Sequence, residues 1–197
     1  FQAAARSMLT KRPLVFIFTP DEEIGSPTTR ALIEAEGRQA AAVLVTEPAR
    51  DGGKIVTARK GVGRFDVEIE GRPAHSGTSH AKGRSAIREA AHQILTIEQM
   101  TDYQRGVTTS VGMVSGGTAA NTIPQRAQFC VDLRVTTAAD GEHFSQAILG
   151  LRAHDPDVRV TVRGDMNRPP YEKNAAVTKL FTEVQGCLLY TSDAADE

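Results

Sequence analysis

Cysteines, long apolar runs and net charge are all scarce in this sequence. Its 197 residues include two cysteines, Cys130 and Cys187, which are too few for a disulfide framework or a four-ligand structural zinc site. No apolar run approaches the roughly 20 residues that cross a bilayer, so we predict no membrane partner. The 23 Lys and Arg residues nearly balance the 24 Asp and Glu residues. Because nucleic-acid binding needs a basic surface, we predict no nucleic-acid partner either.

What remains is an ordinary globular composition, with 40% hydrophobic and 24% charged residues. Two short apolar runs, residues 13–19 and 41–46, are each typical of a strand that is buried on both faces. Between them, residues 28–36 carry helix-forming side chains, and Gly37 follows as a stop signal. The succession of strand, helix and strand predicts a parallel βαβ unit.

A different pattern starts after about residue 60. Residues 64–70 alternate apolar and polar side chains, which predicts a strand with one buried face. A long helix is predicted over residues 84–100, and its apolar side chains share one stripe: Ile87, Ala90, Ala91, Ile94 and Leu95. The other predicted elements are strands at 108–114 and 126–135, a helix at 139–153 and a strand at 158–162. This βαββαβ order is that of a ferredoxin-like sandwich with one open sheet face.

The two patterns predict an α/β chain in which one domain is inserted into another. We assign residues 1–61 to the first domain, 62–165 to the inserted ferredoxin-like domain and 166–186 to the return. The chain opens without methionine in a segment typical of the second half of a helix, so we expect a fragment of a longer protein. Residues 187–197 back-translate to a sequence that resembles a transposase-type sequencing adapter read in frame. We expect them to lie outside the fold, the alternative being a natural amphipathic tail.

Carboxylates follow both predicted parallel strands. Asp21, Glu22 and Glu23 come directly after the first strand, and Glu47 follows the second. The carboxyl ends of neighbouring parallel strands meet at one edge of the sheet, so these groups are expected to converge. A divalent cation would offset their repulsion. The alternative is that Asp21 and Glu22 cap the next turn while Glu47 faces water.

Three further polar residues stand at exposed turns or strand ends of the inserted domain. His75 lies in a turn bounded by glycine and proline, Asn121 lies in a glycine-rich loop between two strands, and Arg134 ends a strand after Asp132. A loop histidine is more often a surface residue than a catalytic one, and an Asp–Arg neighbour pair is often a weak surface ion pair. An arginine also has the planar fork that binds a carboxylate in two places.

Five motifs together resemble the dizinc metallopeptidase family of glutamate carboxypeptidase, aminoacylase and acetylornithine deacetylase/succinyl-diaminopimelate desuccinylase, with glutamate carboxypeptidase the nearest. They are Thr-Pro-Asp-Glu-Glu-Ile-Gly-Ser at 19–26, Thr-Glu-Pro at 46–48, Gly-Arg-Pro-Ala-His-Ser-Gly at 71–77, Gly-Gly-Thr-Ala-Ala-Asn-Thr-Ile-Pro at 116–124 and Asp-Leu-Arg at 132–134. The resemblance runs from about residue 13 to 171. It implies that the first domain is part of a catalytic α/β domain with parallel strands, and that the insert is a lid or dimerisation domain.

The resemblance also implies a metal site. Glu22 is implied to be the general base that takes a proton from the water between two zinc ions. Glu23 is implied to bind one zinc ion and Glu47 the other. The family's His-x-Asp motif, bridging Asp and final His ligand have no match in this sequence. We therefore expect this chain alone to bind zinc weakly and to be inactive, and we expect residues 14–18 and 41–46 to be partly uncovered.

Substrate contacts are implied for the remaining residues. His75 is implied to reach into the partner subunit's site of a homodimer and to stabilise the oxyanion. Asn121 and Arg134 are implied to hold the carbonyl or carboxylate of the substrate, and Arg168 matches more loosely a substrate-contacting arginine.

The activity implied by the resemblance is metal-dependent hydrolysis of an amide or peptide bond next to a free carboxylate. The substrate would be a small peptide or an N-acyl amino acid. Deacylation of N-acyl amino acids by the same family is the near alternative. A protein without catalytic activity, in which the insert serves dimerisation or binding, is the alternative from another class.

Overall fold

The computed structural model describes residues 13–47 and 54–187, which belong to two compact units, Phe1–Pro48 and Ala49–Glu197. Each unit is considered by itself. Among the described helices, none combines the length and apolar character needed to cross a membrane.

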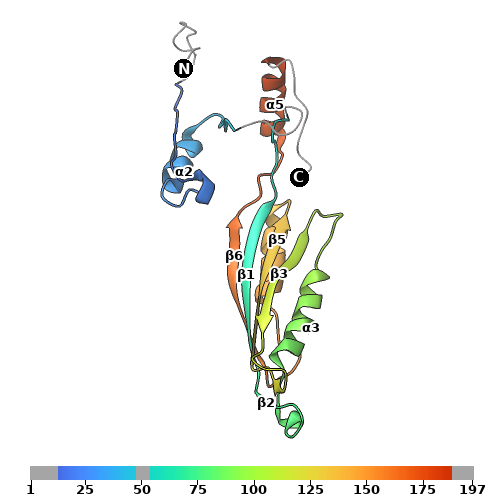
Figure 1. Cartoon of the computed structure of the whole chain (residues 1–197). Coiled ribbons are helices and arrows are strands. Elements are labelled where there is room, and N and C mark those ends of the chain that lie inside the picture. Colours follow the sequence, from blue (N-terminus) through green and yellow to red (C-terminus); the bar gives the residue numbers. More distant parts are fainter. Residues whose placement is uncertain (1–12, 48–53, 188–197) are drawn as a thin grey trace. The chain divides into compact units, whose positions relative to one another are not determined.

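The second unit is built on a four-stranded antiparallel sheet with strand order β3-β5-β1-β6 (Figure 1). Its four strands are β1 (Gly61–Glu70), β3 (Thr108–Gly116), β5 (Arg126–Val135) and β6 (Arg159–Arg168). A separate pair of short strands consists of β2 (Ala74–His75) and β4 (Thr122–Ile123). The helices of the unit are η2 (His80–Lys82), α3 (Ala86–Glu98), α4 (Ala138–Leu149) and α5 (Ala175–Cys187).

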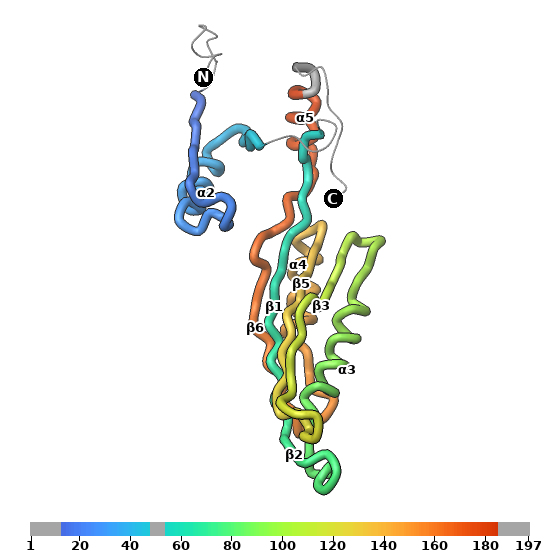
Figure 2. The backbone as a smooth tube through the Cα atoms, viewed as in Figure 1, coloured from blue at the N-terminus to red at the C-terminus, as the bar shows by residue number. Residues whose placement is uncertain are grey.

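Alternation along the strands decides which sheet face is covered. In β1, Phe65, Val67 and Ile69 are buried while the residues between them are exposed. Helices α3 and α4 both pack on the face that these side chains share, where they form one core with the inward side chains of β5. Figure 2 shows the two helices following the strands. The predicted ferredoxin-like βαββαβ order with one open sheet face is confirmed.

Each main helix of this unit starts at a residue that can cap it. The side chain of Ser85 accepts a hydrogen bond from the backbone N–H of Arg88 at 3.1 Å at the start of α3. At the start of α4, the side chain of Thr137 accepts a hydrogen bond from the backbone N–H of Asp140. Such caps satisfy backbone donors that have no partner inside the helix.

The buried stripe of α3 differs from the predicted one. Ala86, Glu89, Ala90, Gln93 and Ile97 are buried, whereas the predicted core residues Ile87 and Leu95 are 46% and 62% exposed. Ala91 is also exposed, and Ala90 and Ile94 contact the core as expected. Glu89 and Gln93 can be buried because both have hydrogen-bond partners in the loop between α4 and β6. The stripe predicted from hydropathy alone was therefore wrong for Ile87, Ala91 and Leu95.

Glu89 holds the loop between α4 and β6 against α3. Its carboxylate accepts hydrogen bonds from the backbone N–H of His154 at 2.9 Å and of Asp155 at 3.2 Å, and from Nε2 of Gln93 at 2.8 Å. Burial by itself raises the pKa of the Glu89 carboxyl, but these hydrogen bonds outweigh burial, so its pKa lies below the ordinary 4.5.

We expect Glu89→Gln to weaken the fold more at neutral pH than at acid pH. A carboxyl whose pKa is lowered by folding stabilises the folded state above the unfolded pKa, and this contribution is lost as the pH falls through the folded pKa. At pH 7 the variant should lose about 1 to 3 kcal/mol of unfolding free energy. Urea unfolding at pH 7 and pH 3, with the exposed Glu142→Gln as control, measures this. An equal loss at both pH values would contradict the assigned role of the charge.

The first unit contains η1 (Glu22–Ile24) and α2 (Arg30–Gln39). The predicted helix at 28–36 is confirmed, but it passes through Gly37 instead of stopping before it. Its last turn is supported by Glu34, which binds Arg30 at 2.8 Å and Arg38 at 2.7 Å.

Neither predicted parallel strand forms. Residues 13–19 and 41–47 belong to no helix or strand in the described chain, so the βαβ unit predicted from them is corrected here. A strand is stabilised by hydrogen bonds to a neighbouring strand, and neither run is part of the two sheets formed by the described residues. The expectation that they are partly uncovered is confirmed, since Phe18 is 80% and Val45 78% exposed.

Candidate functional site

The loop that carries Glu22 and Glu23 is shaped by the buried Asp21. Its Oδ1 accepts a hydrogen bond from Oγ1 of Thr29 at 2.5 Å, and its Oδ2 accepts from the backbone N–H and the hydroxyl of Thr28 at 2.8 and 2.7 Å. The hydrogen bonds from Thr29 and Thr28 lower the pKa of Asp21 to about 2. Asp21 therefore keeps its charge as a cap of this turn, which was one of the two interpretations of the sequence.

This turn leaves Glu22 and Glu23 exposed. Gly25 closes the turn with φ of 89°, a left-handed conformation that glycine adopts without strain, and donates its N–H to the carbonyl of Glu22 at 2.8 Å. Thr28 and Thr29 are the residues that sequence reasoning missed here. Their signal was two hydroxyl side chains at the start of the predicted helix, where the observed α2 begins only at Arg30.

The described structure does not gather the predicted metal ligands. Glu47 is exposed and directly follows the irregular run at 41–46. Within residues 13–47 and 54–187, no three His, Cys, Asp or Glu side chains are close enough together to hold a metal ion. The predicted convergence depended on two paired parallel strands, and these do not form. The carboxylates have the right chemistry for a divalent cation, but Glu23 and Glu47 do not by themselves make a complete site.

His75 and Asn121 are brought together at one end of the second unit. Strand β2 pairs with β4, so that His75 lies opposite Thr122, and the N–H of Ser76 donates to the carbonyl of Asn121 at 2.9 Å. The backbone N–H groups of Gly77 and Thr78 donate to Nδ1 of His75 at 3.1 and 3.2 Å. Nδ1 therefore serves as an acceptor, and in the neutral ring the proton lies on Nε2. The imidazole is exposed, so Nε2 can donate to a ligand.

Arg134 and Arg168 form a second pair at the other end of the sheet. Val62 of β1 lies opposite Arg134 on one side and Arg168 on the other. Directly paired residues share a sheet face, and strands lie about 4.8 Å apart, so the two arginine backbones are roughly 10 Å apart on the open face.

The guanidinium of Arg134 already has a partner. Its Nε donates to Oδ1 of Asp132 at 2.6 Å and a terminal nitrogen donates to Oδ2 at 3.0 Å. These hydrogen bonds raise the pKa of Arg134 above its usual range. A substrate carboxylate at Arg134 must therefore share its guanidinium with Asp132 or displace that carboxylate. Arg168 is exposed, so its guanidinium is accessible to a ligand.

The two pairs are far apart within one chain. They lie near opposite ends of β1, since Arg134 is level with Val62 near the start of the strand and the segment that carries His75 begins after Glu70 at its end. Eight residues of strand span about 27 Å. One small substrate cannot contact both pairs of the same chain.

Comparison with known proteins gives one family match and several relatives. Residues 57–156 match the model of the M20 peptidase dimerisation domain. The chain is similar to an acetylornithine deacetylase of Myxococcus xanthus, with 30% identity over 93% of this chain and 52% of that protein. It is also similar to carboxypeptidase G2 of Pseudomonas sp. (strain RS-16), with 29% identity over 85% of this chain and 41% of that protein. The chain thus spans about half the length of the curated relatives it matches.

Among solved structures, the fold is similar to that of an aminopeptidase PepT from Bacillus cereus. The TM-score is 0.60 at 18% identity, over 76% of this chain and 42% of that one. At this identity the likeness is one of fold.

Proposed function

This chain belongs to the M20 peptidase dimerisation-domain family, and from that membership we propose that the protein carrying it is a metal-dependent hydrolase. The complete protein would cleave an amide or peptide bond next to a free carboxylate, as a glutamate carboxypeptidase-like exopeptidase. The match of residues 57–156 to the family carries this proposal. The arginine pair of Arg134 and Arg168 supports a substrate that ends in a carboxylate, because the guanidinium fork suits that group.

Two residues of the first unit would hold metal. Glu23 would bind one zinc ion and Glu47 the other, with further ligands from elsewhere in the protein. When bound, such ions lower the pKa of water and stabilise developing negative charge. Glu22, exposed beside Glu23, would take the proton from the attacking water and later deliver it to the leaving nitrogen.

His75 would act on the carbonyl oxygen of the substrate. Its Nε2–H is free to donate because Nδ1 is occupied by the N–H groups of Gly77 and Thr78. A donor aimed at a developing oxyanion typically contributes about 10² to 10³ in rate. Asn121, held beside His75 by the pairing of β2 with β4, would bind the same oxygen or the substrate carboxylate.

We propose that His75 and Asn121 serve the site of a second subunit. The separation of about 27 Å along β1 keeps them from a substrate that is bound at Arg134 of their own chain. In a two-fold dimer, the end of one domain can lie against the opposite end of the next. The site would then be completed by both subunits of a homodimer.

The edge formed by α3 and β3 supports this homodimer. Strand β3 lies at the edge of the sheet and has no strand on its outer side among the described residues. Ile87 and Leu95 of α3, together with Met113 and Val114 of β3, are exposed apolar side chains along this edge. An unpaired edge strand next to apolar side chains is a surface that a second copy can cover.

A deacylase of N-acyl amino acids is the second candidate. The similarity to acetylornithine deacetylase over 93% of the chain favours it. The two activities share the metal chemistry and differ in the group on the acyl side of the bond.

The proposal is tested on the complete protein that carries this chain. We expect about two zinc ions per subunit and release of glutamate from an N-acyl or peptidyl glutamate. Parallel assays with N-acetyl amino acids distinguish the deacylase, and chelation followed by zinc addition should remove and restore either activity. A protein without zinc and without hydrolysis of either substrate class would instead support the alternative of a non-catalytic dimerisation or binding protein.

A further inference from the structure

His75 lies on an arm that comprises residues 72–84, with β2 near its start and η2 near its end. The arm is closed at its base by two backbone hydrogen bonds. The N–H of Arg72 donates to the carbonyl of Arg84 at 2.9 Å, and the N–H of Arg84 donates back at 2.8 Å. Gly71 permits this close approach, because a Cβ at that position would collide with the carbonyl oxygen of Arg84.

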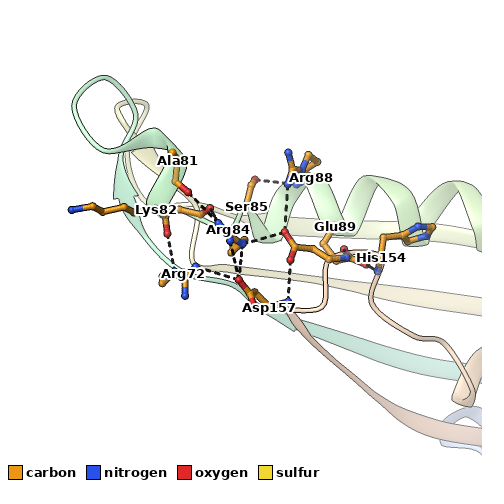
Figure 3. Close-up of polar contacts among 11 residues, drawn as sticks. Arg72, Ala81, Lys82, Arg84, Ser85, Arg88, Glu89, His154 and Asp157 are labelled. Atoms are coloured by element: carbon orange, nitrogen blue, oxygen red, sulfur yellow. Dashed lines mark hydrogen bonds and ion pairs between the residues drawn. The ribbon is translucent and has the colours of Figure 1, made fainter.

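The side chain of Arg84 joins the end of this arm to the loop between α4 and β6. One terminal nitrogen donates to the carbonyls of Gly83 at 2.8 Å and Ala81 at 3.2 Å. Its Nε and the other terminal nitrogen lie 3.0 and 2.9 Å from Oδ2 of Asp157 (Figure 3). The Arg84 side chain is 27% exposed, so this contact is less screened by water than an ordinary surface ion pair.

Arg72 adds a weaker second connection to the same carboxylate. Its Nε donates to the carbonyl of Lys82 at 2.7 Å, and a terminal nitrogen lies 3.4 Å from Oδ2 of Asp157. Both ends of the arm therefore meet at one carboxylate.

The loop that carries Asp157 is itself fixed to α3. The buried carboxylate of Glu89 accepts from the N–H groups of His154 and Asp155, and Nε2 of Gln93 donates to the carbonyl of Arg152 at 2.8 Å. Figure 3 shows this succession of contacts from Glu89 to Arg84 and the arm. It links the packed core to the segment that presents His75.

We propose that Arg84 is a positioning residue for His75. The inference rests on the proposed function of His75 as an oxyanion donor. Among the described residues, the imidazole is oriented by N–H groups of its own arm, Gly77 and Thr78, and by the β2–β4 pair, so its place depends on how the arm is held. Lysine cannot replace Arg84 fully, because a single ammonium cannot bridge two carbonyls and a carboxylate in the geometry of the planar guanidinium.

The test uses Arg84→Gln in the complete protein, with Arg88→Gln as matched control. Arg88 lies four residues further on, in the first turn of α3, is 64% exposed and contacts Asp155 at 3.6 Å. We expect Arg84→Gln to lower kcat by about 10- to 100-fold with KM within about twofold, because small displacements of a catalytic group have effects of this size. Arg88→Gln should change kcat by less than about twofold. Equal effects of the two variants would overturn the proposal.

A double-variant cycle separates positioning from general loss of structure. If Arg84 acts through His75, adding Arg84→Gln to His75→Ala should lower kcat no further. Additive losses would overturn the proposal. A His75→Ala variant with normal kcat would instead refute the proposed role of His75.

Amide exchange in this chain supplies a readout that needs no activity. We expect Arg84→Gln to speed exchange of the Gly77 and Thr78 amides by about tenfold or more, and Arg88→Gln to leave both unchanged. Unchanged exchange in Arg84→Gln would overturn the positioning role whatever the kinetics show.

If Arg84→Gln fails to fold, Arg84→Lys replaces it, since lysine keeps the charge at Asp157 and loses the bridge to the two carbonyls. It should show the same fall in kcat and faster exchange, and normal values for both would overturn the proposal.

Discussion

Replacing Glu22 by glutamine is expected to lower kcat of the complete protein by about 10² to 10⁴-fold, the usual contribution of a general base. Glutamine has nearly the same shape but cannot take a proton at neutral pH. The turn should survive the change, because Asp21 and its hydrogen bonds from Thr28 and Thr29 hold it independently of Glu22.

Kinetics, zinc content and thermal unfolding of the same preparations measure this effect. Glu36→Gln on α2 makes the same chemical change outside the loop and should behave like the wild type. A Glu22→Gln variant with normal zinc content and kcat within a few-fold of the wild type would show that another group is the base.

Mixing two inactive variants is expected to restore activity. Glu22→Gln subunits lack the base but still carry His75, and His75→Ala subunits lack the donor but still carry Glu22. If His75 serves the partner's site, each mixed dimer has one site with both groups. Random exchange makes about half of the dimers mixed, so about one quarter of the wild-type activity should return.

The same experiment distinguishes a shared site from a self-contained one. If His75 acted within its own subunit, no site of a mixed dimer would have both groups, and the mixture would stay inactive. Adding Leu95→Lys and Val114→Lys to both variants supplies the control, because lysines at these exposed apolar positions of α3 and β3 should prevent the pairing of subunits. Restoration that persists in these monomeric variants would refute the shared site.

The fold of the second unit was predictable because its information is local. The apolar alternation of β1 and β5 decides which side chains face the helices, and the caps at Ser85 and Thr137 mark where α3 and α4 begin. The predicted and observed bounds of β5 agree at residues 126–135, and the order of elements leads to the ferredoxin-like sheet.

The candidate site was predictable only in part. The structure confirms that His75 is exposed on its turn, and it also leaves Glu22 and Glu23 exposed. The pairing of Arg134 with Asp132 was one of two interpretations, and the coordinates show that this pair forms, while the substrate contact of Arg134 stays a prediction. Arg84 and Asp157 were not identified at all, since their contact joins residues that are 73 positions apart in sequence.

The sequence by itself determined the order of helices and strands in the second unit and the family of the chain, because periodicity and motifs are properties of neighbouring residues. Tertiary structure decided what depends on partners distant in sequence. Glu89 could turn inward, leaving Ile87 and Leu95 exposed at the β3 edge, because a loop some 65 residues later supplies its hydrogen bonds. The runs at 13–19 and 41–47 stay irregular because a strand exists only beside another strand. The length of β1 separates His75 from Arg134, and this distance is the physical reason to place the two in a site shared between subunits.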